Sequence, residues 1–140
     1  MGQKDIQLIK GGAFTDDRGK LVYNNDVLLD EIKRVYIITN ANCETIRAWQ
    51  GHQVEGRWFS AIQGKFLIKL VKPDNWITPS KDLEILSYEL DSETLDYLVV
   101  PPGYVSSIQS LEKDSKLMVM SNYSLGEIND EYKYEKNYWK

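Results

Sequence analysis

The sequence predicts an all-β fold of the sandwich or barrel kind, in a single domain spanning residues 1–140. Most of the chain consists of short extended segments rich in β-branched and aromatic residues, and turn residues such as glycine, proline and asparagine separate them. The length suits one domain, because domains commonly contain about 100–150 residues. No internal repeat or linker-like stretch divides the chain.

Seven segments have the composition and spacing of β-strands. The alternation is clearest at 65–72, where Phe66, Ile68 and Leu70 fall on one face of the expected strand. The segment 97–100 runs into Pro101-Pro102-Gly103, which indicates a strand end and a tight turn. In chain order, the predicted strands are 34–39, 45–54, 57–62, 65–72, 84–90, 97–100 and 116–120.

Helical signals are weak. Residues 26–32 have the composition for one or two helical turns. The tail, 124–140, carries many charges and aromatic residues but lacks the 3.6-residue period of an amphipathic helix. Its aromatic residues, Tyr138 and Trp139 among them, favour an arm packed on the surface, with reach to a partner subunit, over a loosely ordered tail.

The composition argues against several classes of protein. With 17 basic and 21 acidic residues the net charge is −4, which argues against a nucleic-acid partner but permits a local basic pocket. No apolar run approaches the roughly 18 residues of a membrane span. The single cysteine, Cys43, cannot form an intrachain disulfide and favours the reducing cytoplasm. The single histidine, His52, excludes a metal centre built on several histidines of one chain.

Five short segments stand in a consistent order. They are FTDDRG at 14–19, IKRVYII at 32–38, IRAWQGHQ at 46–53, VPPGYVS at 100–106 and MVMSNYS at 118–124. Together they resemble the dTDP-4-dehydrorhamnose 3,5-epimerases and the related dTDP-sugar 3,4-ketoisomerases, which are small cupins. The resemblance extends from Phe14 to about Trp139 and implies a cupin jelly roll, a β-sandwich that encloses a pocket, in a homodimer.

The third segment contains the histidine. Epimerases carry R-G-x-H here and ketoisomerases carry R-G-x-H-x-H; Arg47 keeps the arginine, Gln50 replaces the first histidine and His52 matches the second. On a strand, Gln50 and His52 point to the same face. Imidazole titrates near neutral pH and suits proton removal beside a ketone, whereas an amide cannot act as a base. The alternative is a structural role for His52.

The other segments supply the remaining candidates. The resemblance implies that Arg18 contacts the nucleotide diphosphate, and a planar guanidinium suits phosphate oxygens. Arg57 lies seven residues before Gly64, as an epimerase lysine lies seven residues before its own strand-end glycine, so Arg57 or Arg47 would stabilise the enolate that forms. Tyr36 and Tyr123 match tyrosines of the family's active sites, and in the epimerases the tyrosine matched by Tyr123 returns the proton. The plainer alternatives are a solvated turn arginine and tyrosines packed in the core.

Ser106 replaces the histidine of the epimerase segment P-P-G-F-x-H. In metal-dependent cupins that position is a ligand, together with an H-x-H pair and a glutamate. Here the pair reads Gln50-Gly51-His52, and Glu55 follows only three residues later. The sequence therefore predicts no metal and no cofactor, and leaves Ser106 and Gln50 as candidate substrate-binding residues.

The resemblance implies a metal-independent epimerase or isomerase of a nucleotide-diphosphate 4-keto-6-deoxy sugar, active in carbohydrate or polysaccharide biosynthesis. A 3,4-ketoisomerase is one alternative. A second is a cupin that binds the sugar nucleotide without turnover, because Gln50 and Ser106 stand where the epimerases use histidine. A third is a cupin for an unrelated ligand, with Trp49, Trp58 or Trp76 stacked on a ring.

Overall fold

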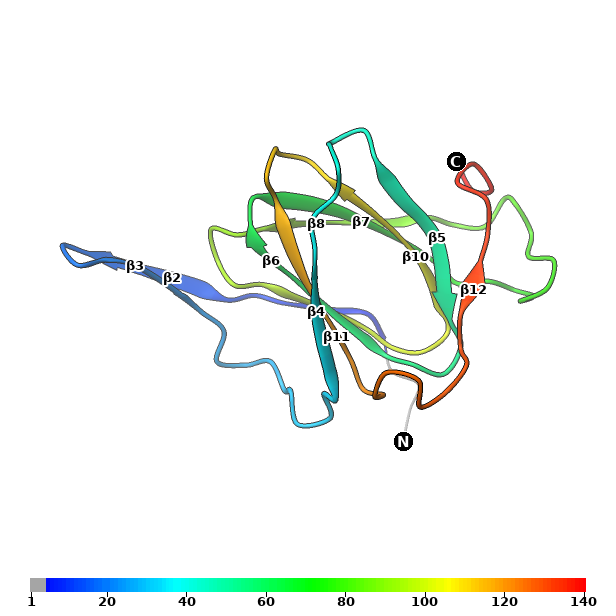
Figure 1. Cartoon of the computed structure of the whole chain (residues 1–140), viewed down its shortest axis with the longest axis horizontal. Coiled ribbons are helices and arrows are strands. Elements are labelled where there is room, and N and C mark those ends of the chain that lie inside the picture. The colour runs from blue at the N-terminus through cyan, green and yellow to red at the C-terminus, as the bar shows by residue number, and fades with distance from the viewer. Residues whose placement is uncertain (1–4) are drawn as a thin grey trace.

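The computed structural model describes residues 5–140 and is built from β-strands (Figure 1). Two five-stranded sheets pack face to face, with strand orders β1-β9-β6-β11-β4 and β12-β5-β10-β7-β8, and β2-β3 forms a separate hairpin. The strands are β1 (Gln7–Ile9), β2 (Gly12–Asp16), β3 (Gly19–Tyr23), β4 (Arg34–Ile38), β5 (Ile46–His52), β6 (Arg57–Gln63), β7 (Lys65–Val71), β8 (Leu86–Asp91), β9 (Tyr97–Val100), β10 (Tyr104–Ser110), β11 (Lys116–Ser121) and β12 (Tyr132–Lys133). The predicted all-β, cupin-like sandwich is confirmed.

The core lies between the two sheets. Phe66, Ile68 and Leu70 of β7 are fully buried, as their alternation predicts. They belong to one cluster with residues of the facing sheet, including Phe59 and Leu117. Burying one such side chain contributes roughly 1.5–3 kcal/mol, so this apolar interface holds the sheets together.

Each of the seven predicted strand segments overlaps a strand, whereas β1, β2, β3, β10 and β12 were not predicted. The longest strand that was not predicted is β10. It pairs with β5 and β7 in the middle of the second sheet. Its serines, which are typical of turns, obscure the strand pattern. Ser107 and Ser110 are nevertheless buried, because the strand lies between two neighbours.

The helical turns expected at 26–32 do not form. The Asn24 side chain accepts hydrogen bonds from the backbone N–H groups of Asp26 and Val27, a local turn that competes with a helix. Val27 and Ile32 pack instead on the outer face of the first sheet, against the cluster that contains Trp58. Over residues 5–140, no helix has both the length and the apolar character of a membrane span.

The C-terminal tail packs on its own chain. β12 adds to the edge of β5, and Trp49 and Tyr134 exchange backbone hydrogen bonds of 3.1 and 3.0 Å. Further along, Trp139 is buried edge-on against Trp49 with ring centroids 5.3 Å apart, and its indole N–H donates to the Ser80 carbonyl at 2.8 Å. The tail therefore supports the strand that carries the central sequence motif.

Candidate active site

A cavity of about 390 Å³ lies between the two sheets. It brings together six of the eight site residues predicted from the sequence, which are Tyr36, Arg47, Gln50, His52, Arg57 and Ser106. The apolar part of its lining includes Ile38, Phe59 and Ile108. A second hollow of about 540 Å³ opens beside Lys81 and Tyr138 at the tail, but contains none of the predicted residues.

An irregularity in β5 brings Arg47 to the cavity. Ser106 pairs with Gln50, and two residues later Ile108 pairs with Arg47, so three steps along β5 match two along β10. Such a bulge changes which side chains share a face. Simple alternation places Gln50 and His52 together, and the bulge adds Arg47 to the same lining.

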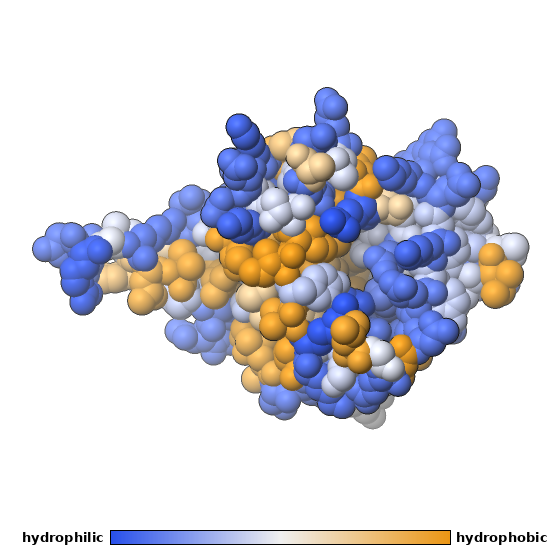
Figure 2. Space-filling model, viewed as in Figure 1, coloured by the Kyte–Doolittle hydropathy of each residue, from blue (hydrophilic) through white to orange (hydrophobic). Residues whose placement is uncertain are grey.

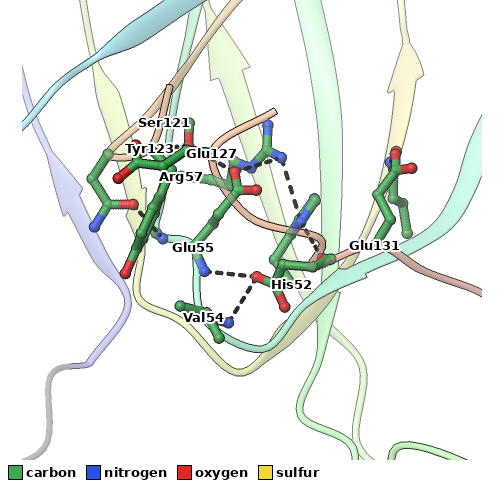
Figure 3. Close-up of polar contacts among 12 residues, drawn as sticks. His52, Val54, Glu55, Arg57, Ser121, Tyr123, Glu127 and Glu131 are labelled. Carbon is green, nitrogen blue, oxygen red and sulfur yellow. Dashed lines mark hydrogen bonds and ion pairs between the residues drawn. The ribbon is translucent and has the colours of Figure 1, made fainter. Parts of the chain in front are cut away.

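Arg57 is the centre of a buried polar network (Figure 3). Its Nη1 donates to the Tyr36 hydroxyl at 2.7 Å, and its Nη2 lies 3.1 Å from Glu55 Oε1. The same Glu55 oxygen accepts a 2.7 Å hydrogen bond from the Ser121 hydroxyl. The side chains of Arg57 and Glu55 are each 10% exposed, so water screens their attraction little. The network fixes the guanidinium beside both Tyr36 and His52, whose Nδ1 lies 3.4 Å from Arg57 Nη2.

Asp130 sets the orientation of His52. The Asp130 backbone carbonyl lies 3.0 Å from His52 Nδ1, closer than Arg57 Nη2 at 3.4 Å; because a carbonyl only accepts, this shorter contact places the proton of neutral His52 on Nδ1. The Nε2 lone pair is then free for a ligand. The Asp130 carboxylate accepts from the backbone N–H groups of Gln53, Val54 and Glu55 at 2.8–2.9 Å, which holds the turn after β5.

Burial of the imidazole holds the pKa of His52 below its ordinary value of 6.5. The nearby positive charge of Arg57 lowers this pKa further, and the negative charge of Glu55 opposes both effects. At neutral pH the ring is therefore uncharged and able to accept a proton.

Gln50 and Ser106 are neighbours across the β5–β10 pair. Gln50 Nε2 donates to Glu131 of the tail at 2.5 Å, and the Ser106 hydroxyl lies 3.4 Å from the Gln50 carbonyl. Neither side chain accepts a proton at neutral pH. Their place in the lining suits hydrogen bonding to a ligand.

Two predicted residues do not line the cavity. Arg18 lies at the turn of the β2–β3 hairpin, which projects from the body in Figure 1, and pairs with Asp16 at 2.8 Å. Tyr123 follows β11, where its backbone N–H donates to the Ser121 hydroxyl at 3.2 Å. In Figure 3 Tyr123 lies across Glu55 from His52.

The three tryptophans considered as stacking platforms also lie outside the cavity lining. Trp49 packs with Trp139, and Trp58 lies in the cluster on the outer face of the first sheet. Trp76 contacts Tyr132, with ring centroids 4.8 Å apart.

His52, Glu55 and Asp130 place ligand-type atoms within 4.8 Å of one another, a spacing that a metal ion could bridge. Their hydrogen bonds do not fit a metal. Both Asp130 oxygens accept backbone N–H groups, and Glu55 Oε1 already meets Arg57 and Ser121. The Arg57 guanidinium supplies the positive charge that a metal would otherwise bring.

Sequence reasoning did not assign Glu55, Ser121 and Asp130 to this network. Glu55 entered only as a poor metal ligand, and Asp130 was given no role. Asp130 is 78 residues from His52, and Ser121 is 66 residues from Glu55. No local motif encodes contacts over such separations. The nearest signal in the sequence is the acidic residue Glu55, two positions before Arg57, in the connection that leads into β6.

We predict that the His52 imidazole titrates with a midpoint below 6.5 in the folded protein, because burial and Arg57 disfavour its charged form. The unfolded chain then takes up this proton first, so the free energy of unfolding falls as the pH is lowered from about 6.5 towards the folded pKa. An NMR titration measures the midpoint directly, since the chain has one histidine. The denatured chain is the control and should titrate near 6.5; a folded midpoint at or above that of the denatured chain contradicts the prediction.

No protein-family model matches the chain, and no curated protein matches it. Among solved structures it is similar to the 3,4-ketoisomerase QdtA of Thermoanaerobacterium thermosaccharolyticum, solved as a His-to-Asn mutant in complex with TDP-4-keto-6-deoxyglucose. The two chains share 20% sequence identity and superimpose with a TM-score of 0.71, over 98% of this chain and 93% of QdtA. It is also similar to dTDP-4-dehydrorhamnose 3,5-epimerase of Sulfolobus tokodaii, at 19% identity and TM-score 0.73 over 95% of this chain and 78% of that one. The chain therefore has the cupin-like β-sandwich fold of these sugar isomerases and epimerases, as the sequence resemblance predicts.

Proposed function

We propose that the protein is a metal-independent epimerase or isomerase of a nucleotide-linked 4-keto-6-deoxy sugar. The observation that carries this proposal is the placement of His52 and Tyr36 on facing sheets of one cavity, on β5 and β4. A ligand between them meets a base on one side and a phenol on the other. The solved structures of similar fold support the substrate class, because QdtA binds TDP and TDP-4-keto-6-deoxyglucose.

The proposed reaction begins with proton transfer to His52 Nε2 from the carbon next to the ketone. The C–H electron pair becomes a C=C bond, and the carbonyl π electrons move to oxygen. Arg57 stabilises this enolate, since its guanidinium is fixed beside both reacting side chains. Tyr36 then delivers its hydroxyl proton to the carbon from the opposite face, and both side chains recover their protonation states by exchange with water.

The charge of the cavity supports an anionic ligand. Its described lining includes Arg47 and Arg57 but no carboxylate, and because Glu55 offsets the charge of Arg57 from outside the lining, the charge of Arg47 remains, in a chain whose net charge is −4. Positive charge concentrated in a recess attracts an anion such as a diphosphate. Gln50 and Ser106 would then bind sugar hydroxyls or the ketone.

We predict that the protein catalyses exchange of solvent deuterium into dTDP-4-keto-6-deoxyglucose at C3, C5 or both. His52→Asn should slow this exchange by about 100- to 10,000-fold, the usual contribution of a positioned base, while dTDP binding persists. NMR in heavy water measures both the rate and the product. Both an epimerase and a 3,4-ketoisomerase need this enolising step, so exchange alone does not distinguish them. The identity of the product does.

Each contrary outcome has a distinct meaning. Nucleotide binding without exchange would establish a non-catalytic cupin, and neither binding nor exchange would contradict the substrate class. EDTA is the control for metal independence. A rate that EDTA abolishes and zinc restores would contradict the metal-free mechanism.

Tyr36 rather than Tyr123 is the proposed proton donor, because Tyr36 lines the cavity and contacts Arg57. We expect Tyr36→Phe to lower turnover at least roughly 100-fold with little change in dTDP affinity. The matched substitution, Tyr123→Phe, should lower it far less. If Tyr123→Phe lowered turnover more than Tyr36→Phe in the same assay, Tyr123 would be the proton donor instead.

We further propose that the protein is a homodimer in the cytoplasm. β4 is the edge of the first sheet, and its Val35 and Ile37 are more than half exposed. The projecting hairpin also exposes Phe14 and Leu21, and Figure 2 shows apolar surface along it and across the middle of the body. An open, apolar strand edge tends to pair with another chain. In such a dimer the hairpin could bring Arg18 to the partner subunit's cavity, as the family resemblance implies.

We predict that Val35→Glu shifts the protein from dimer to monomer, because it places a charge on the apolar edge strand. Sedimentation velocity measures the shift. Ile77→Glu is the matched control, since Ile77 is 81% exposed in the β7–β8 loop and should leave the dimer intact. A wild-type protein that sediments as a monomer at micromolar concentration contradicts the dimer.

A further inference from the structure

We propose that Asn40 is a positioning residue: it fixes the guanidinium of Arg47 so that the two terminal nitrogens remain free at the cavity for the anionic end of the ligand. This inference rests on the proposed function in that it takes this anion to be the diphosphate of a sugar nucleotide. It adds a residue that neither the sequence motifs nor the proposed reaction assigns.

The orientation of Asn40 is set by the backbone around it. Asn40 follows β4 and is only 9% exposed despite its polar amide. Its Nδ2 lies 3.3 Å from the Thr45 carbonyl and 3.4 Å from the Ile108 carbonyl. Carbonyl groups only accept, so the NH₂ group of the amide must face them, and Oδ1 must point away.

Asn40 Oδ1 meets Arg47. It accepts a hydrogen bond of 2.9 Å from Arg47 Nε. Arg47 is an exposed residue, and a long exposed side chain is normally free to move among many rotamers. The bond to a buried, oriented amide restricts Arg47 before any ligand arrives, which reduces the entropy lost on binding.

The free edge of Arg47 is suited to an anion. Arg47 lines the cavity, and over residues 5–140 its Nη1 and Nη2 have no hydrogen-bond or ion-pair partner. Arg57 differs, because its two Nη atoms are engaged by Tyr36 and Glu55. Arg47 therefore carries the cavity's uncompensated positive charge, and its paired N–H groups match two oxygens of a phosphate.

The loop that holds Asn40 offers a matched control. Asn42 accepts hydrogen bonds from the Glu44 backbone N–H and the Thr45 hydroxyl, at 2.9 Å each. Asn42→Ala therefore also removes side-chain hydrogen bonds from this loop, but it removes no contact with Arg47. A general effect of loop stability would appear in both alanine variants.

Calorimetric titration with dTDP tests the proposal. We expect Asn40→Ala to weaken dTDP binding about tenfold, the scale of a hydrogen bond to a charged group, and Asn42→Ala to leave it unchanged. Arg47→Ala should weaken binding at least as much, and Asn40→Ala should add no further loss in the Arg47→Ala background. An equal loss from Asn40→Ala in both backgrounds would overturn the proposal, because Asn40 would then act independently of Arg47.

A spectroscopic measurement separates positioning from simple loop damage. The ¹⁵N-detected Nε–H signal of Arg47 should be protected from solvent exchange in the wild type and in Asn42→Ala, and unprotected in Asn40→Ala. Unchanged protection in Asn40→Ala would overturn the proposal. If Asn40→Ala fails to fold, Arg47→Lys carries the test, since lysine keeps the charge without an Nε–H; wild-type dTDP affinity in Arg47→Lys would overturn the proposal.

Inorganic pyrophosphate distinguishes this inference from the proposed function. A wild type that binds pyrophosphate but not dTDP would contradict the sugar-nucleotide assignment. The Asn40–Arg47 pair would still stand if Asn40→Ala weakened pyrophosphate binding. A wild type that binds neither would overturn the anion site, and the deuterium-exchange experiment would decide the sugar chemistry separately.

Discussion

A single buried guanidinium, that of Arg57, constrains the rest of the site. A charge with so little exposure requires a partner of opposite sign, and Glu55 provides it from the turn after β5. That turn is held in place by the Asp130 carboxylate, and Asp130 belongs to the tail that Trp139 anchors on the body. Removing one member of a buried ion pair typically costs about 3–5 kcal/mol, so the tail, the turn and β6 depend on one another for stability as well as for the placement of Tyr36 and His52.

The pairing of strands converts a short motif into a cavity. β5 contributes Arg47, Gln50 and His52 from the second sheet, while β4 and β6 contribute Tyr36 and Arg57 from the first. Regular alternation would separate Arg47 from Gln50, because they lie three positions apart on β5. The bulge opposite Ser106 and Ile108 restores them to one face. The cavity lining therefore contains a fixed cation, Arg57, and a second arginine, at the bulged part of β5, whose terminal nitrogens remain available.

Local patterns in the sequence were sufficient to predict most of the fold and part of the site. Alternation and turn residues located seven strands, and the family resemblance located six of the residues that line the cavity. β10 escaped prediction because its buried serines look like turn residues, and the Asn24 turn replaced the expected helix at 26–32. Asp130, Ser121 and Asn40 could not be assigned from sequence, since each acts through contacts that only the folded sheets create. Arg18 and Tyr123 match family segments, yet their own chain does not bring them to the cavity.

The absence of histidine at positions 50 and 106 makes the proposed chemistry depend on one group. Gln50 and Ser106 cannot accept a proton at neutral pH, so His52 is the base available in the described lining. Burial and Arg57 both disfavour its protonated form, which keeps the free ring ready but makes the imidazolium costly. A developing enolate changes this balance, because its negative charge beside Arg57 and His52 offsets the new positive charge on the ring. In the proposed reaction, proton transfer to His52 is therefore favoured when a ligand that develops negative charge occupies the cavity, so the electrostatics that keep the free ring neutral are compatible with its proposed role as the base.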